Sequence, residues 1–133
     1  MKLPPANTAP LDRARMRRRL SGAERRLAES LASGRGVFAV APTGTKVDVG
    51  RWLGKRRICA CVLADEMVLL APGRRPYAES IALADLQASR YNHVTGEVML
   101  APATGARLRR LKLAPLEGLQ LLAQIYKVDE NHA

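Results

Sequence analysis

The sequence predicts an α+β fold, mainly β, in which a curved antiparallel sheet or barrel of about seven strands follows one helix and is capped by another. Three changes of spacing support this prediction. Apolar residues recur every three or four positions before residue 34, every second position from 37 to 113, and every three or four again after Pro115. A helix and a sheet each have an apolar face, so we expect the last helix to cover the sheet.

The N-terminal helix has recognisable end signals. Ser21 and Glu24 have the spacing of a capping box, and Gly34 can adopt the left-handed conformation that ends a helix. These signals predict a helix over about residues 22–33.

The apolar stripe of this helix extends further back than its cap. The stripe consists of Met16, Leu20, Ala23, Leu27 and Leu31. Because the spacing continues without a gap, one longer helix from about Pro10 also fits. We favour the longer helix.

Alternating polar and apolar residues predict the strands. They span residues 37–41, 45–53, 56–64, 67–71, 78–83, 87–94, 97–101 and 107–113. Turn residues separate them, including Pro42-Thr43-Gly44, Thr95-Gly96 and Thr104-Gly105, and Gly50 suggests a bulge or bend. Both faces of 56–64 are apolar, which is typical of a central strand. The leucines of 107–113 change parity, which favours a bulge there.

The C-terminal helix is expected from Pro115, a residue favoured at the first helical position, to about Lys127. Its predicted apolar stripe comprises Leu116, Leu119, Leu122 or Ala123, and Tyr126, widened by Leu121 and Ile125. Three parts of one domain follow: a basic N-terminal arm with its helix over 1–36, the sheet and last helix over 37–127, and a tail over 128–133.

Composition limits the class of protein. The chain has 133 residues, of which 47% are hydrophobic but only 4% aromatic, so aliphatic side chains must fill the core of a single domain. No run of apolar residues is long enough to span a bilayer, and the N-terminus lacks the apolar middle of a secretory signal. We therefore expect a cytoplasmic protein.

Positive charge is concentrated near the N-terminus. The net charge is +10, and residues 1–36 hold nine basic and three acidic residues, which leaves +6 in that segment. Such a surface attracts polyanions: nucleic acid, anionic lipid headgroups or acidic proteins. The candidate anion-binding residues are Arg13, Arg15, Arg17, Arg18, Arg19, Lys46, Arg107, Arg109, Arg110 and Lys112. The alternative for each is a solvated, solubilising surface.

No cofactor, metal or catalytic site is expected. Cys59 and Cys61 would point the same way from a strand, which disfavours a disulfide between them, and small buried thiols are the simpler interpretation. His93 is expected in an exposed turn. Trp52 is expected in the core, with a role at a membrane interface as the alternative.

The segments "LADEMVLL" (63–70), "YAESIALADLQASRYNHVTGEVMLA" (77–101) and "LRRLKLAPLEGLQLLAQI" (108–125) resemble the bacterial branch of the pleckstrin-homology-like (PH-like) domains. The pause at residues 81–86 falls where that family bends between strands. The resemblance covers about residues 37–127.

The resemblance implies a non-enzymatic binding module. Its partner would be another protein or further copies of the same chain, with the basic arm adding attraction to anions. In this family, lipid headgroups usually meet a basic cluster on the first strand loop, where this chain has Lys46 alone in residues 41–46. The alternative function is direct binding of nucleic acid or of an anionic membrane. We also expect that removing residues 1–20 leaves the domain folded.

Overall fold

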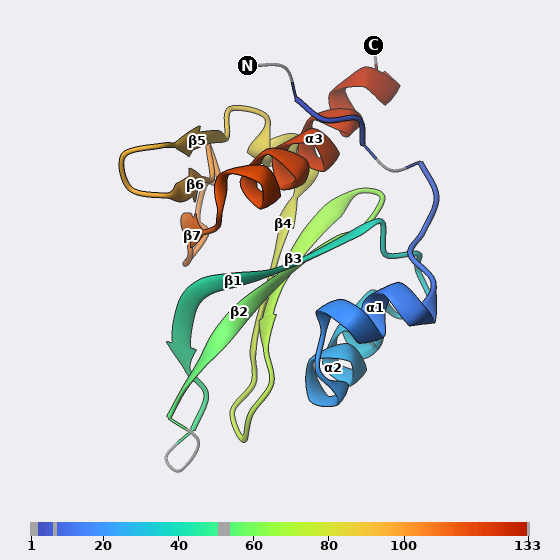
Figure 1. Cartoon of the computed structure of the whole chain (residues 1–133), viewed down its shortest axis with the longest axis vertical. Coiled ribbons are helices and arrows are strands. Elements are labelled where there is room, and N and C mark those ends of the chain that lie inside the picture. Colours follow the sequence, from blue (N-terminus) through green and yellow to red (C-terminus); the bar gives the residue numbers. More distant parts are fainter. Residues whose placement is uncertain (1–2, 7, 51–53, 133) are drawn as a thin grey trace.

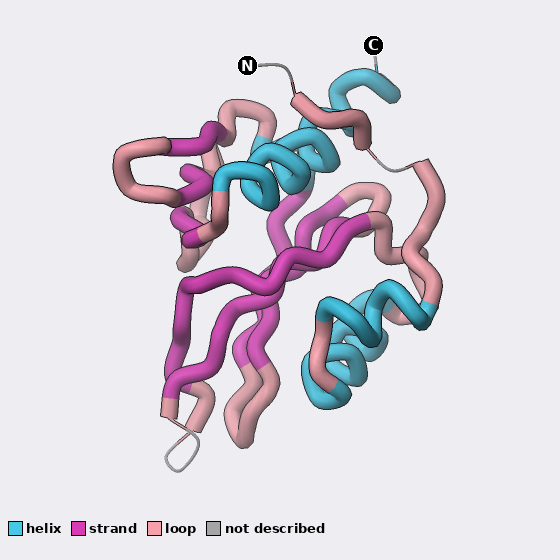
Figure 2. Tube along the Cα trace, viewed as in Figure 1, coloured by secondary structure: helices cyan, strands magenta, loops and turns pink. Residues whose placement is uncertain are grey.

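The computed structural model describes residues 3–6, 8–50 and 54–132, in three α-helices, one 3₁₀ helix and seven strands (Figures 1 and 2). The elements in order are α1 Arg13–Arg19, α2 Gly22–Ala32, β1 Ala39–Asp48, β2 Lys55–Val62, β3 Glu66–Ala71, β4 Tyr77–Ala82, η1 Leu83–Leu86, β5 Arg90–Asn92, β6 Glu97–Met99, β7 Arg110–Lys112 and α3 Pro115–His132. The predicted α+β class, with a C-terminal helix, is confirmed.

The strands form two antiparallel sheets and not a closed barrel. The first sheet has the order β1-β2-β3-β4, and the second has the order β5-β6-β7. After β4 the chain turns through η1, whose Leu83 and Leu86 are buried, so that β5 begins a separate sheet. The barrel alternative is therefore wrong, while β2 is central as its two apolar faces predict.

Side chains of the first sheet point alternately to its two faces, and each face packs in a hydrophobic cluster of its own. Cys59, Cys61 and Leu63 point to the face covered by α1 and α2, together with Val68 and Leu70 of β3. Their neighbours Ile58, Ala60 and Val62 point to the opposite face, where α3 and the second sheet lie. Three layers result: α1 and α2, which together are called the helical hairpin, then the first sheet, and then the second sheet with α3 (Figure 1).

The N-terminal stripe forms two helices, so the longer single helix is wrong. Ser21 is the N-cap of α2 and has extended backbone angles, which interrupts the helix between Arg19 and Gly22. The predicted capping box is present: Glu24 N–H donates to Ser21 Oγ, and Ser21 N–H donates to Glu24 Oε1. Asp12 caps α1 separately by accepting from Arg15 N–H.

The break also changes which residues are buried. Met16, Leu20, Ala28 and Ala32 are buried, Leu27 and Leu31 are half-buried, and Ala23 is exposed. Because Met16 and Leu20 pack in the core, the first helix is part of the domain. The expectation that residues 1–20 are dispensable for folding is not supported by this packing.

Several strand boundaries differ from the prediction. The turn expected at Pro42-Thr43-Gly44 is a bulge within the continuous strand β1, between Pro42 and Lys46. Thr43 stays inside the strand because its hydroxyl donates to the carbonyl of Ile58 on β2. Of the segment 107–113, only 110–112 is a strand, and 87–94 keeps only 90–92.

Helix α3 starts at Pro115 as predicted and buries most of its predicted stripe. Leu121, Leu122 and Ile125 are buried, whereas Leu116 is 64% exposed. Leu116 lies in the first turn of α3. The helix extends to His132, past the expected end at Lys127.

Two smaller predictions are confirmed: His93 is exposed in a turn, and both cysteines are buried free thiols. Trp52 lies outside the described residues. None of the helices that the structure describes is long and apolar enough to cross a membrane.

Candidate functional site: a cleft between α1 and α3

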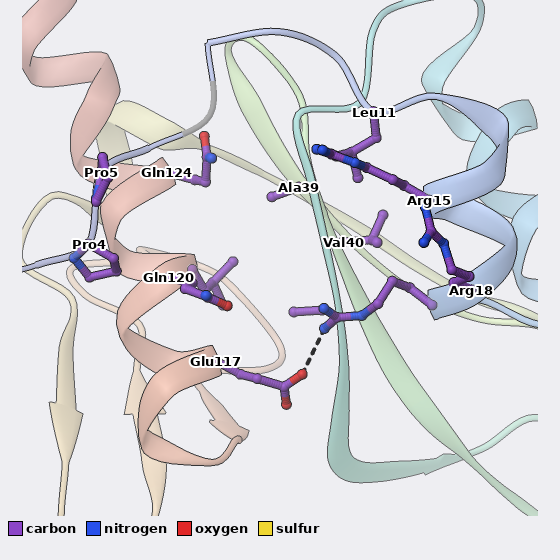
Figure 3. A pocket seen from close by; sticks show the side chains of 13 residues that line it. Pro4, Pro5, Leu11, Arg15, Arg18, Ala39, Val40, Glu117, Gln120 and Gln124 are labelled. Atoms are coloured by element: carbon purple, nitrogen blue, oxygen red, sulfur yellow. Dashed lines mark hydrogen bonds and ion pairs between the residues drawn. The ribbon is translucent and has the colours of Figure 1, made fainter.

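A cleft of about 610 Å³ opens at the edge of the first sheet, between α1 and α3 (Figure 3). Its size is in the range of ligand-binding pockets. The lining residues come from the N-terminal segment, α1, the first half of β1, and α3: Pro4, Pro5, Leu11, Arg15, Arg18, Arg19, Ala39, Val40, Ala41, Glu117, Gln120, Leu121 and Gln124.

The α1 wall of the cleft is cationic. Arg15 carries no ion pair or side-chain hydrogen bond with any residue that the structure describes, and its side chain extends from α1 into the cleft (Figure 3). Arg18 Nε donates to the carbonyl of Ala14 within the same helix. Arg19 forms an ion pair of 2.7 Å with Glu117 of α3. Three arginines against one glutamate leave an excess of positive charge that favours an anionic ligand.

The α3 wall is polar and partly unsatisfied. Gln124 is only 6% exposed, yet its amide finds no hydrogen-bond partner among the described residues. The amide atoms of Gln124 keep some contact with the cleft. In the described part of the chain, every fully enclosed side-chain donor or acceptor has a hydrogen-bond partner. Figure 3 shows Gln124 pointing from α3 toward β1, one turn of helix beyond Gln120. A buried amide without a partner is costly unless a ligand or water satisfies it.

The α1 wall is positioned by a partly buried ion-pair network beneath it. Arg57 of β2 donates from Nε to Glu24 Oε2 and from Nη2 to Glu24 Oε1, both at 2.8 Å. Cys59 Sγ also contacts Glu24 Oε2, at 3.2 Å. Arg57 Nη2 further reaches the carbonyl of Arg19 at 3.4 Å, so the network joins the end of α1, the start of α2 and β2.

The electrostatics of this network follow from its bonds. The hydrogen bonds from Arg57 lower the pKa of Glu24 to about 2, so Glu24 is ionised at neutral pH. Burial raises the pKa of Cys61 to about 12, and burial together with the Glu24 carboxylate raises the pKa of Cys59 further. Both thiols are therefore poor nucleophiles and poor metal ligands.

Ten residues were predicted to contact anions, and the structure divides them. Arg15, Arg18 and Arg19 line the cleft, while Arg13 and Arg17 lie exposed on the same helix outside its lining. Lys46 of β1, Arg109, and Arg110 and Lys112 of β7 are exposed. The neighbouring strands β1 and β7 meet where Lys112 N–H donates to Thr45 Oγ1.

Arg107 has a structural role at a different place. Its backbone N–H donates to Glu79 Oε2, and its Nη2 donates to the carbonyl of Ala78. Its guanidinium lies 4.6 Å from the centre of the Tyr77 ring. Burial raises the pKa of Tyr77 to about 12. Although burial alone would raise the pKa of Glu79, the bonds from Arg107 and Tyr77 lower it. The basic residues of 107–112 therefore do not form one continuous anion-binding surface.

A second basic surface joins two loops that are distant in sequence. The β3–β4 loop packs against the end of β1, where Arg75 N–H donates to the Val49 carbonyl at 2.8 Å. A Cβ on Gly50 would lie 3.1 Å from Arg74 Cβ. Lys55 and Arg56 at the start of β2 and Arg74 and Arg75 are exposed at this end of the sheet (Figure 1).

Sequence reasoning missed the α3 wall and the strand edge. Gln124 stands between Leu121 and Ile125, two fully buried positions, and a polar residue on the apolar face of a helix is the signal that could have identified it. Ala39, Val40 and Ala41 carry no such signal. Within the described residues, no group of three or more His, Cys, Asp or Glu side chains is placed to hold a metal ion.

Comparison of the chain with models of protein families, with curated proteins and with solved structures finds no match. The cleft and its chemistry are therefore the basis on which a function can be assigned.

Proposed function

We propose that this chain is a non-enzymatic binding module of the PH-like kind, which recognises an acidic segment of a protein partner in the cleft between α1 and α3. Seven antiparallel strands followed by a C-terminal helix that begins at Pro115 are the order that the resemblance implies, and this order supports the assignment. The helical hairpin is an addition that supplies the cationic wall of the cleft.

One observation carries the proposal: Arg15 and Gln124 approach the same cleft from opposite sides, and the side chain of neither has a partner among the described residues. A carboxylate accepts charge-assisted hydrogen bonds from a guanidinium, and a backbone or side-chain amide can satisfy Gln124. The floor of Val40, Ala41 and Leu121 is apolar. Such a cleft fits a ligand that combines negative charge with small apolar groups.

The surface gives less support to self-association. Only Val94 and Leu116 are large exposed apolar side chains in the described part of the chain, and they come from a hairpin tip and a helix start. Interfaces between identical subunits usually bury an apolar patch. We therefore favour a separate partner with an acidic segment over a second copy of this chain.

The test compares two pairs of arginines on one helix. Arg15→Gln with Arg18→Gln alters the cleft, whereas Arg13→Gln with Arg17→Gln removes the same charge from exposed positions outside its lining. The probe is a short capped peptide of alternating glutamate and valine, and its lysine–valine counterpart is the control ligand. Calorimetry or NMR titration measures the affinity of each protein for each peptide.

We expect the cleft variant to bind the glutamate peptide about tenfold more weakly or worse, since each lost charge-assisted bond contributes roughly 1.5–3 kcal/mol. The control variant should stay within about threefold of the wild type. Equal losses in the two variants would show that net charge and not the cleft determines binding. Equal binding of the lysine peptide would show that the cleft does not recognise negative charge.

A second candidate function is attachment to an anionic membrane through the paired loops. The observation that favours it is the packing of Arg74 and Arg75 against the β1–β2 hairpin, next to Lys55 and Arg56. Each basic residue near an anionic surface contributes about 1 kcal/mol. Sedimentation with phosphatidylcholine vesicles, with and without phosphatidylserine, should show salt-sensitive binding that Arg74→Gln with Arg75→Gln weakens about tenfold or more. Binding that the loop variant retains would reject this candidate.

A further inference from the structure

The floor of the cleft is the edge of a sheet. Strand β1 is the terminal strand of the first sheet, and β2 pairs with only one of its sides. At one end, Leu11 N–H of the N-terminal segment donates to the carbonyl of Val37, just before β1. At the other end, Lys112 of β7 donates to Thr45. Between these two contacts, Ala39, Val40 and Ala41 line the cleft.

The direction of the backbone groups on this edge follows from the register. Opposed residues of an antiparallel pair alternate between those that exchange backbone hydrogen bonds and those that do not. Phe38 N–H and Thr43 Oγ1 donate to the carbonyls of Val62 and Ile58, so these even-numbered residues of β2 face β1. Leu63 N–H donates to Glu66, so the odd-numbered residues face β3.

The register then assigns the residues of β1. Ala39 pairs with Val62 and Ala41 with Ala60, so their backbone groups face β2. Val40 is opposite Cys61, whose groups face β3, so the N–H and C=O of Val40 point away from the sheet and toward the cleft. Among the residues that the structure describes, none is bonded to these two groups.

We propose that the acidic segment binds as an extended strand that pairs antiparallel with β1 at Val40. This inference depends on the proposed function and specifies its geometry. Addition of a strand to an exposed edge is a general mode of peptide recognition, in which the main chain supplies affinity and alternate side chains supply specificity. The antiparallel orientation follows from its slightly greater stability per residue.

The two walls determine the sequence pattern of the bound segment. Val40 packs with Met16 and Leu20, on the α1 side of the sheet, whereas Ala41 packs with Leu121, on the α3 side. A residue directly opposite Val40 shares its face, so its side chain meets Arg15 and Arg18. The flanking residues face α3, where small apolar or polar groups meet Leu121 and Gln124. Acidic and small apolar residues should therefore alternate.

The alternating glutamate–valine peptide tests this pairing through its backbone. In the proposed register the glutamate amides bond to β1 and the valine amides point to solvent. N-methylation of the glutamate amides should lower the affinity at least tenfold, while N-methylation of the valine amides, a matched control with the same number of methyl groups, should change it less than about threefold. Any other ranking of the two methylated peptides overturns the pairing.

Hydrogen exchange gives an independent measurement on the protein side. The amide of Val40 should exchange at least about tenfold more slowly with the peptide bound, whereas the amide of Ala41, which already faces β2, should not change. Binding that depends on Arg15 and Arg18 without protection of Val40 would overturn strand pairing but leave acid recognition intact. No binding of the glutamate peptide by the wild type would contradict both.

Discussion

Replacing Glu24 by glutamine tests the network that holds α1 and α2 against β2. The substitution keeps the shape of the side chain and removes the charge that accepts two bonds from Arg57. Lowering a pKa from 4.5 to about 2 corresponds to roughly 3 kcal/mol of stabilisation. The Arg57 side chain is 44% exposed, so solvent screens the pair, and we expect a loss of about 1–2 kcal/mol in the free energy of unfolding.

The sign of the pH dependence follows from the direction of this pKa. The folded protein holds the Glu24 proton less tightly than the unfolded chain, so the stabilisation is present above the unfolded pKa of 4.5 and disappears as the pH falls toward 2. The difference between wild type and Glu24→Gln should be constant from about pH 7 to 5 and should shrink below that. Urea denaturation followed by circular dichroism measures it.

Glu29→Gln is the matched control for this experiment. Glu29 lies on the same helix, its side chain is 52% exposed, and its carboxylate is 4.0 Å from Arg25, so its loss should cost less than about 0.5 kcal/mol. A Glu24→Gln difference that does not change with pH, or that equals the Glu29→Gln difference, would refute the assignment of stability to the Glu24–Arg57 pair.

Three further predictions concern packing and capping. Gly118→Ala should destabilise the fold by about 1–3 kcal/mol, because the new Cβ would lie 2.6 Å from the ring of Tyr91; thermal unfolding measures this. Ser21→Ala should cost about 1 kcal/mol through loss of the α2 cap, measured by urea denaturation. Cys59 and Cys61 should react with a thiol reagent only after denaturant is added, since both are buried and burial raises their pKa values.

Each of these predictions has a contradicting result. Gly22→Ala, at the exposed start of α2, is the packing control, and a loss as large as that of Gly118→Ala would exclude a specific clash with Tyr91. An unchanged free energy of unfolding in Ser21→Ala would show that the cap does not contribute to stability. Fast labelling of both thiols in the native protein would show that the hairpin opens readily from the sheet.

The capping box predicts the start of α2 correctly, whereas the apolar stripe that runs through it wrongly predicts one long helix. The spacing of Ser21 and Glu24 predicts a capping box because its atoms are only three residues apart. The same cap contradicts a single long helix, since an N-cap residue needs extended backbone angles. The apolar stripe concealed this conflict, because Met16, Leu20 and Ala28 belong to the same hydrophobic cluster even though Leu20 and Ser21 interrupt the helix.

Of the candidate site, the sequence predicts the positive charge of α1 but not the cleft, the edge of β1 or the α3 wall. The arginine run pointed to α1, but which arginines face a ligand depends on the rotation of α1 relative to β1 and α3, and the residues that set this rotation are far apart in the chain. Arg19 and Glu117 are 98 positions apart. The edge of β1 was missed because the glycine and proline in residues 42–44 predict a turn, whereas the bulge and the bond from Thr43 to Ile58 keep the strand continuous.

The packing of α1 and α2 on the first sheet has a consequence during synthesis. The helical hairpin leaves the ribosome before β2 and β3, the strands that carry Cys59, Cys61 and Leu70 beneath it. Until those strands emerge, Met16 and Leu20 lack part of the cluster in which they are buried, and the short helix α1 is too small to be stable by itself. The N-terminal helices can therefore complete their packing only after the chain has been translated past Ala71.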